Sequence, residues 1–168
     1  QAIRLNPNLA LAYNNRGHTH TEKGDYDRAL ADFEQAIRLN PKLVGYVGRA
    51  NFWQIRGDPE RAMADLDQAI RLNPKSAVAY NNRGIILQDR GELDRALADY
   101  EQAIQLQPNK NYYINRGNLW RKKGDLDRAL ADQDKAISLS PSVGPLYSSR
   151  GETRRYRGDL VGAIADYD

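Results

Sequence analysis

Residues 1–7 read Gln-Ala-Ile-Arg-Leu-Asn-Pro, and the same seven residues return at 35–41 and 68–74. Looser copies stand at 102–108 and 135–141. The prolines that close the five copies are separated by 34, 33, 34 and 33 residues. A fixed period of this length is typical of proteins in which each structural unit packs on the next. The repeat therefore decides the fold class before any single element is considered.

Each repeat contains the pattern of two helices separated by a glycine and an acid, as in Gly24-Asp25. The glycine can end the first helix in the left-handed region, and the acid can cap the second. In the first repeat we predict helices over 9–23 and 26–39, and Asn40-Pro41 should end the second one. Apolar residues on both helices recur every three or four positions, which gives each helix one apolar face. A single hairpin cannot bury that face alone, so the repeats should stack.

The period divides the chain into a half helix, four full repeats and a shortened fifth repeat. The boundaries are 1–8 for the half helix, 9–41, 42–74, 75–108 and 109–141 for repeats one to four, and 142–168 for the fifth. We expect one continuous all-α solenoid. The second and fourth repeats are one residue short, within 42–45 and 109–112. This shortening predicts a tighter loop or first turn and a local change in stacking, with the helix retained.

The repeat pattern also continues from the last residue to the first, because Asp168 followed by Gln1 would restore an uninterrupted unit. The sequence leaves two explanations open, a fragment of a longer array and a chain that is a whole number of repeats. Both predict unpaired apolar helix faces at the two ends. Stacking of the tail of one molecule on the start of another would be an open, head-to-tail contact that builds filaments.

The spacing of the recurring residues in each unit resembles the tetratricopeptide repeat family over essentially the whole chain. The first repeat carries this pattern at Tyr13, Gly17, Ala29, Phe33, Ala36 and Pro41. The fourth repeat departs from it at Gln133, where the family usually has an aromatic residue. The resemblance implies a right-handed superhelix of stacked helix hairpins whose first helices line a concave face. It also implies a protein–protein interaction scaffold.

Every repeat has an arginine where the family usually has a leucine, and an aspartate one residue before the aromatic position of the second helix. An unpaired buried charge is costly, so we predict that each arginine pairs with the aspartate of its own or an adjacent repeat. Such pairs would set register more than they add stability. The alternative is that both residues are simply exposed. The residues are Arg16, Arg49, Arg83, Arg116 and Arg150, with Asp32, Asp65, Asp99, Asp132 and Asp166.

The family resemblance places a peptide-binding groove at the inward positions of the first helices. Amides there could bond the backbone of an extended peptide, and the few apolar residues could seat its side chains. The alternative is that these are ordinary solvated helix positions. The candidates are Asn14, His18, Thr21, Val47, Asn51, Gln54, Asn81, Ile85, Gln88, Ile114, Asn118, Arg121, Ser148, Glu152 and Arg155.

The net charge of +3 lies entirely in residues 109–168, with basic runs at 121–123 and 154–157. Cations suit the C-terminal end of a helix, which is one explanation for both runs. The other is a basic rim that attracts an acidic peptide segment toward the C-terminal repeats. Family members that clamp a C-terminal carboxylate use paired lysines on their first helices. This sequence has no such pair, so we do not expect that activity.

The composition argues against several classes of function. The absence of cysteine excludes disulfides, zinc–thiolate sites and thiol catalysis. His18 and His20 are two residues apart and should point to different sides of a helix, and no phosphate-binding loop is present. We therefore expect no catalysis, no cofactor and no metal.

The remaining composition bears on partners and compartment. Most tyrosines occupy packing positions, which leaves few for base stacking, so no nucleic-acid partner is expected. A mean hydropathy of −0.77 and the lack of a long apolar window predict a soluble protein without a membrane span. The compartment is left open by the missing cysteines, with the cytoplasm favoured.

Overall fold

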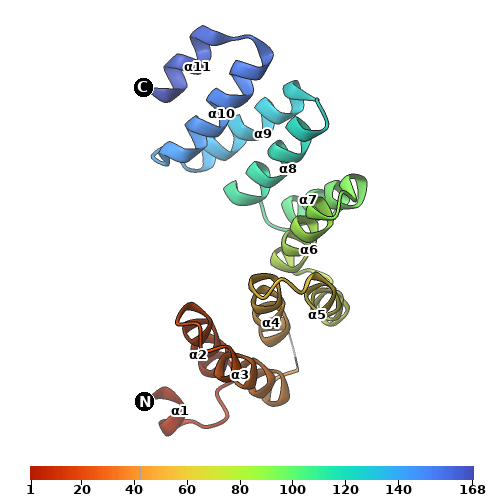
Figure 1. Cartoon of the computed structure of the whole chain (residues 1–168), viewed down its shortest axis with the longest axis vertical. Helices are drawn as coiled ribbons and strands as arrows, with labels where there is room; N and C mark the ends of the chain where they lie inside the picture. The colour runs from red at the N-terminus through yellow and green to blue at the C-terminus, as the bar shows by residue number, and fades with distance from the viewer. Residues whose placement is uncertain (42) are drawn as a thin grey trace. The chain divides into compact units, whose positions relative to one another are not determined.

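The computed structural model describes residues 1–41 and 43–168, which form eleven helices and no strand (Figure 1). The helices are α1 (Ala2–Leu5), α2 (Ala10–Glu22), α3 (Tyr26–Leu39), α4 (Leu43–Ile55), α5 (Pro59–Leu72), α6 (Ala77–Asp89), α7 (Leu93–Leu106), α8 (Lys110–Lys122), α9 (Leu126–Leu139), α10 (Gly144–Arg157) and α11 (Leu160–Tyr167). From α2 onward they alternate between first and second helices of a repeat. The predicted all-α class of stacked helix hairpins is confirmed.

The turn inside each hairpin follows from the glycine–acid pair. Gly24 has a φ of +76°, and the N–H of Asp25 donates to the carbonyl of His20 over 2.9 Å, which closes the end of α2. The Asp25 carboxylate then accepts a hydrogen bond from the backbone N–H of Arg28 and caps α3. The glycines of the other four turns also have positive φ values. The chain reverses direction here because only glycine adopts this backbone without strain.

The predicted helix boundaries agree closely with the observed ones. The second helix of the first repeat runs from Tyr26 to Leu39 as expected, and the first helix, Ala10–Glu22, is one residue shorter at each end than the prediction. In the short fourth repeat, α8 begins two residues after Pro108, whereas α2 and α10 begin three residues after their prolines. The missing residue is thus taken from the loop and α8 keeps its 13 residues. Lys42, where the short second repeat begins, lies outside the described residues.

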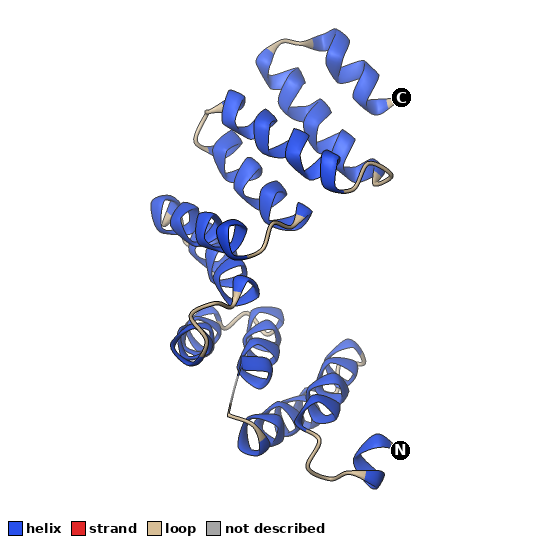
Figure 2. Ribbon diagram, turned by 180° about the vertical axis from the view of Figure 1, so that it is seen from behind, coloured by secondary structure: helices blue, strands red, loops and turns tan. Residues whose placement is uncertain are grey.

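The contacts divide the chain into two compact units, Gln1–Ile86 and Leu87–Asp168. Figure 2 shows that each unit consists of helices joined by short loops. The prediction of one continuous solenoid across both units is not tested and stays a prediction.

The core of the first unit depends on close approach of helices at glycine. Phe33 of α3 is fully buried, and its ring lies where a Cβ on Gly17 or Gly48 would be only 2.9 Å from the Cε1 atom. Phe33 therefore fills the space between α2, α3 and α4. A second cluster of Ala50, Ala62, Leu66, Ala69, Ala79 and Ile86 continues the same pattern through α4, α5 and α6.

The core of the second unit has a polar centre where Gln133 replaces the usual aromatic residue. Gln133 is fully buried, and its amide donates to Thr153 Oγ1 over 2.8 Å and to the carbonyl and hydroxyl of Ser149. These bonds join α9 to α10. The neighbouring apolar contacts come from Ala136, Ile137 and Leu146.

Candidate functional site

In four of the five repeats, the arginine and aspartate form a forked ion pair between the first and second helices. Arg116 donates from Nε and Nη2 to the two carboxylate oxygens of Asp132 over 2.8 and 2.7 Å. The same arrangement joins Arg16 to Asp32, Arg49 to Asp65 and Arg150 to Asp166. All four aspartate side chains are buried. Arg83 and Asp99 fall in different units, so their pairing stays a prediction.

Some of these arginines also contact the preceding repeat. Arg150 Nη1 donates to Asp134 over 2.7 Å, and Arg83 Nη1 donates to Asp67 over 2.8 Å. The hydrogen bond to Asp132 raises the pKa of Arg116, and burial opposes that rise. In each forked pair, a buried carboxylate accepts two hydrogen bonds from the guanidinium and so ties the first helix of the repeat to the second. That these pairs set register stays a prediction.

In the first unit, several residues of the predicted groove are packing residues. Asn14 and Thr21 are buried, and the Thr21 hydroxyl donates to the carbonyl of Gly17 over 2.9 Å. Asn14 lies against Gly48, where a Cβ would come within 2.2 Å of its Oδ1 atom. Asn81 is buried as well.

The remaining candidates of the first unit are partly accessible. His18 packs edge-on against the Phe33 ring with 5.1 Å between centroids, and burial lowers the pKa of its imidazole. Asn51 accepts a hydrogen bond from the Asn82 amide over 2.9 Å. Val47, Gln54 and Ile85 are half-buried.

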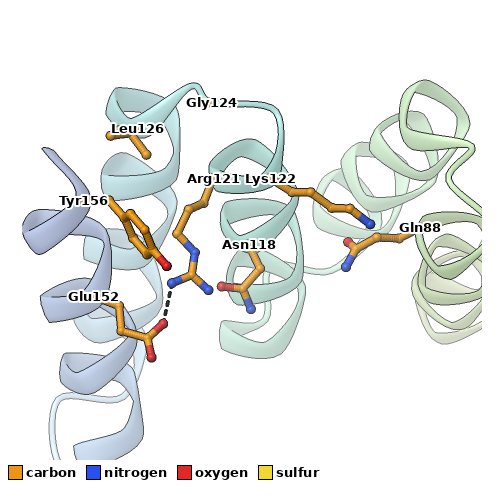
Figure 3. A pocket seen from close by; sticks show the side chains of 8 residues that line it. All are labelled: Gln88, Asn118, Arg121, Lys122, Gly124, Leu126, Glu152 and Tyr156. Atoms are coloured by element: carbon orange, nitrogen blue, oxygen red, sulfur yellow. Dashed lines mark hydrogen bonds and ion pairs between the residues drawn. The ribbon is translucent and has the colours of Figure 1, made fainter.

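The second unit brings four predicted groove residues into one pocket of about 670 Å³ between the first helices (Figure 3). Gln88 comes from α6, Asn118 and Arg121 come from α8, and Glu152 comes from α10. Lys122, Leu126 and Tyr156 complete the lining, together with Gly124. Ser148 lines a neighbouring pocket with Asn118, Arg121 and Glu152. Of the other two candidates, Ile114 packs against the core and Arg155 is exposed.

The pocket has a mixed but mainly positive charge. Arg121 Nη1 donates to Glu152 Oε2, so one cation is paired across α8 and α10. In Figure 3, Arg121 turns to the Glu152 side while Lys122 extends on the Gln88 side. Within residues 1–41 and 43–168, no acid forms an ion pair with Lys122. The guanidinium carbon of Arg121 lies 5.9 Å from the Tyr156 ring centroid, and that of Arg155 lies 5.1 Å from it.

Four of the pocket residues, Lys122, Gly124, Leu126 and Tyr156, were not among the predicted groove positions. Lys122 and Tyr156 each follow directly after a predicted position, and Leu126 opens a second helix. Among these residues, Lys122 had a sequence signal in the basic run at 121–123. Other cations of the two runs are held by acids: Lys123 pairs with Asp94 over 2.5 Å, and Arg154 pairs with Asp166 over 2.9 Å.

The stacked helix hairpins of the two units define a helical-repeat protein. Models of the tetratricopeptide repeat match residues 10–43, 77–110 and 111–143, which together are more than half of the chain. The chain belongs to the tetratricopeptide repeat family. No curated protein matches the sequence.

Solved structures with the same fold have low sequence identity to this chain. PilF of Pseudomonas aeruginosa superposes with a TM-score of 0.87 at 19% identity, over 95% of this chain and 73% of that one. TTC0263, a thermophilic protein of this family in Thermus thermophilus, has a TM-score of 0.80 at 26% identity, over 90% and 84%. YrrB has a TM-score of 0.68 at 22% identity, over 98% and 86%.

The described residues also bear on two other kinds of site. None of the described helices is both long and apolar enough to cross a membrane. Among those same residues, no cluster of three or more histidine, aspartate or glutamate side chains has a geometry suited to a metal ion.

Proposed function

We propose that this chain is a protein–protein interaction scaffold that binds a peptide segment on the surface of its first helices. The pocket between α8 and α10 is its best-defined site in the second unit. The observation that carries the proposal is the convergence of Gln88, Asn118 and Arg121 with the cation Lys122 around one cavity. These groups can bond the backbone and side chains of an extended peptide. YrrB, which shares the fold, is described as having an unusual peptide-binding site.

The charge of the pocket favours an acidic segment. Of the two cations that line the pocket, Lys122 has no acid partner among the described residues, while Arg121 has one. Complementary charge raises the rate of encounter and disfavours basic partners. This preference agrees with the position of the whole surplus charge in residues 109–168.

Selection from a displayed random-peptide library tests the proposal. Peptides selected on the unchanged protein should lose at least about tenfold in affinity when Lys122→Glu reverses the charge in the pocket. Lys135→Glu is the matched control, because Lys135 is exposed on α9 and does not line the pocket. Equal losses in both variants, or selected peptides that ignore Lys122→Glu, would count against the pocket as the binding site.

Head-to-tail self-association is a second candidate function, and the exposed face of α11 favours it. Leu160 and Ile164 are 60% and 61% exposed, whereas Leu130, which holds the position of Ile164 in α9, is 8% exposed. An apolar face of this kind is suited to covering by another first helix. Sedimentation equilibrium should show concentration-dependent association that Ile164→Glu abolishes. A monomer at every concentration would remove this candidate.

A further inference from the structure

The ion pair between Arg121 and Glu152 differs from the forked pairs inside the repeats. Glu152 engages only Nη1 of Arg121, and the two side chains are 53% and 25% exposed. The carboxylate of Asp132 is 7% exposed and engages two nitrogens of Arg116. An exposed pair with one hydrogen bond is weak and exchanges readily with other ligands, whereas a buried fork does not.

The pair is also not part of what stacks one repeat on the next. Arg121 and Glu152 occupy positions that recur in every pair of adjacent repeats. The corresponding pairs are Thr21 with Asn51, Gln54 with Ile85, and Gln88 with Asn118, none of which is ionic. The other repeats thus stack without an ion pair at these positions. The ion pair between Arg121 and Glu152 is therefore not required for stacking.

The location of the pair suggests a role in binding. Both side chains line the pocket, and the Glu152 carboxylate is paired with the guanidinium to which a ligand carboxylate would bind. Arginine presents a planar fork of donors, and Glu152 uses one arm of it. On the Gln88 side of the same pocket, Lys122 is a second cation without an acid partner in the described part of the chain.

We propose that Glu152 is an internal competitor for the ligand, holding Arg121 until an aspartate or glutamate side chain of a bound peptide displaces it. This inference rests on the proposed binding of an acidic peptide in the pocket. The Glu152 side chain is already 53% exposed while paired, so water can solvate it once it is displaced. Because Glu152 must be displaced first, a peptide with a single acidic side chain binds Arg121 weakly. A peptide with a second acidic side chain also pairs with Lys122, and so it binds more tightly than a peptide with one.

Removing the competing charge provides the test. Glu152→Gln keeps the shape of the side chain but not its charge, and it should raise affinity for fluorescein-labelled hexaglutamate about threefold to tenfold in fluorescence anisotropy. Glu101→Gln is the matched control for a general change in net charge, because Glu101 is exposed on α7 and does not line this pocket. In an Arg121→Gln background, Glu152→Gln should have at most a small effect, because the competition needs Arg121.

The outcomes separate this inference from the proposed function. Weaker binding in Arg121→Gln together with no change in Glu152→Gln overturns the competitor and leaves the acidic-peptide site standing. Equal gains in Glu152→Gln and Glu101→Gln also overturn it, since net charge alone then explains them. If the protein binds hexalysine and Glu152→Gln weakens that binding, the competitor role is overturned as well, because Glu152 would then be a ligand-binding group. If no variant binds hexaglutamate, both the competitor role of Glu152 and the preference for acidic peptides are overturned. The library-selected peptides then still test whether the pocket binds peptides at all.

Discussion

Replacing Asp132 by asparagine should destabilise the second unit far more than the same change at an exposed aspartate. Asp132 is 7% exposed and Arg116 is 21% exposed, and two hydrogen bonds of 2.7 and 2.8 Å join them. Asparagine has nearly the same volume, so the variant removes charge without opening a cavity. Its amide oxygen can accept one of the two bonds, but its NH₂ group then faces a second donor of the guanidinium.

The expected cost is about 2–3 kcal/mol. A hydrogen bond to a charged group contributes about 1.5–3 kcal/mol, and breaking a fully buried ion pair costs about 3–5 kcal/mol. The lower part of this range applies because water reaches a fifth of Arg116. Asp127 pairs with Arg157 over 3.1 Å but is 87% exposed, so Asp127→Asn should cost less than about 0.5 kcal/mol.

Urea unfolding followed by circular dichroism and by tryptophan fluorescence measures the difference. With a slope near about 2 kcal/mol per molar urea, the Asp132→Asn midpoint should fall by about 1 M. Trp120 is suited as a probe because it is buried on α8, the helix that carries Arg116. The double variant Arg116→Met with Asp132→Leu should recover most of the loss. Indistinguishable midpoints for Asp132→Asn and Asp127→Asn would refute the reasoning.

Three further predictions concern single positions. Gly124→Ala should cost about 1 kcal/mol because Gly124 has a φ of +83°, so the variant should unfold at a lower temperature than the unchanged protein, and an unchanged midpoint would contradict this. Burial lowers the pKa of His18, so the contribution of the neutral imidazole to stability is present above about pH 6.5 and is lost as the pH falls below that value. Between about pH 7.5 and 5, the free energy of unfolding should therefore fall less in His18→Gln than in the unchanged protein. Parallel plots of the free energy of unfolding against pH would contradict this. Phe33→Ala should destabilise the first unit by about 3–5 kcal/mol in the same urea assay, since the fully buried ring fills the space beside Gly17, and a loss below about 1 kcal/mol would show that the space collapses.

The fold could be predicted because its signals are local and repeated. The Gly24-Asp25 pair fixes where one helix ends and the next begins, and both the positive φ and the cap of Asp25 are observed. The period then supplies the number of hairpins. The pairing of Arg116 with Asp132 also follows from a repeated pattern, because two complementary charges recur at a constant separation.

The candidate site could be predicted only in part, because accessibility depends on how closely neighbouring helices approach. Asn14 occupies a groove position by its place in the repeat, but Gly48 lets α4 come close enough to bury it. No pattern within the first repeat contains that information. The sequence also does not predict the hydrogen bond between Arg121 and Glu152. These residues are 31 positions apart, and their equivalents in the other repeats are not charged pairs.

The packing of each helix mainly on its neighbours in sequence has a consequence for synthesis on the ribosome. In the second unit α8 packs against α7 and α9, and α10 packs against α9 and α11. A ribosome adds about 5–20 residues per second, so one repeat takes a few seconds to emerge, while a helix forms in about a microsecond. Each hairpin can therefore close and dock on the one before it during translation. Apolar side chains such as those of Leu119 and Leu146 need not wait for a distant part of the chain before they are shielded from other nascent proteins.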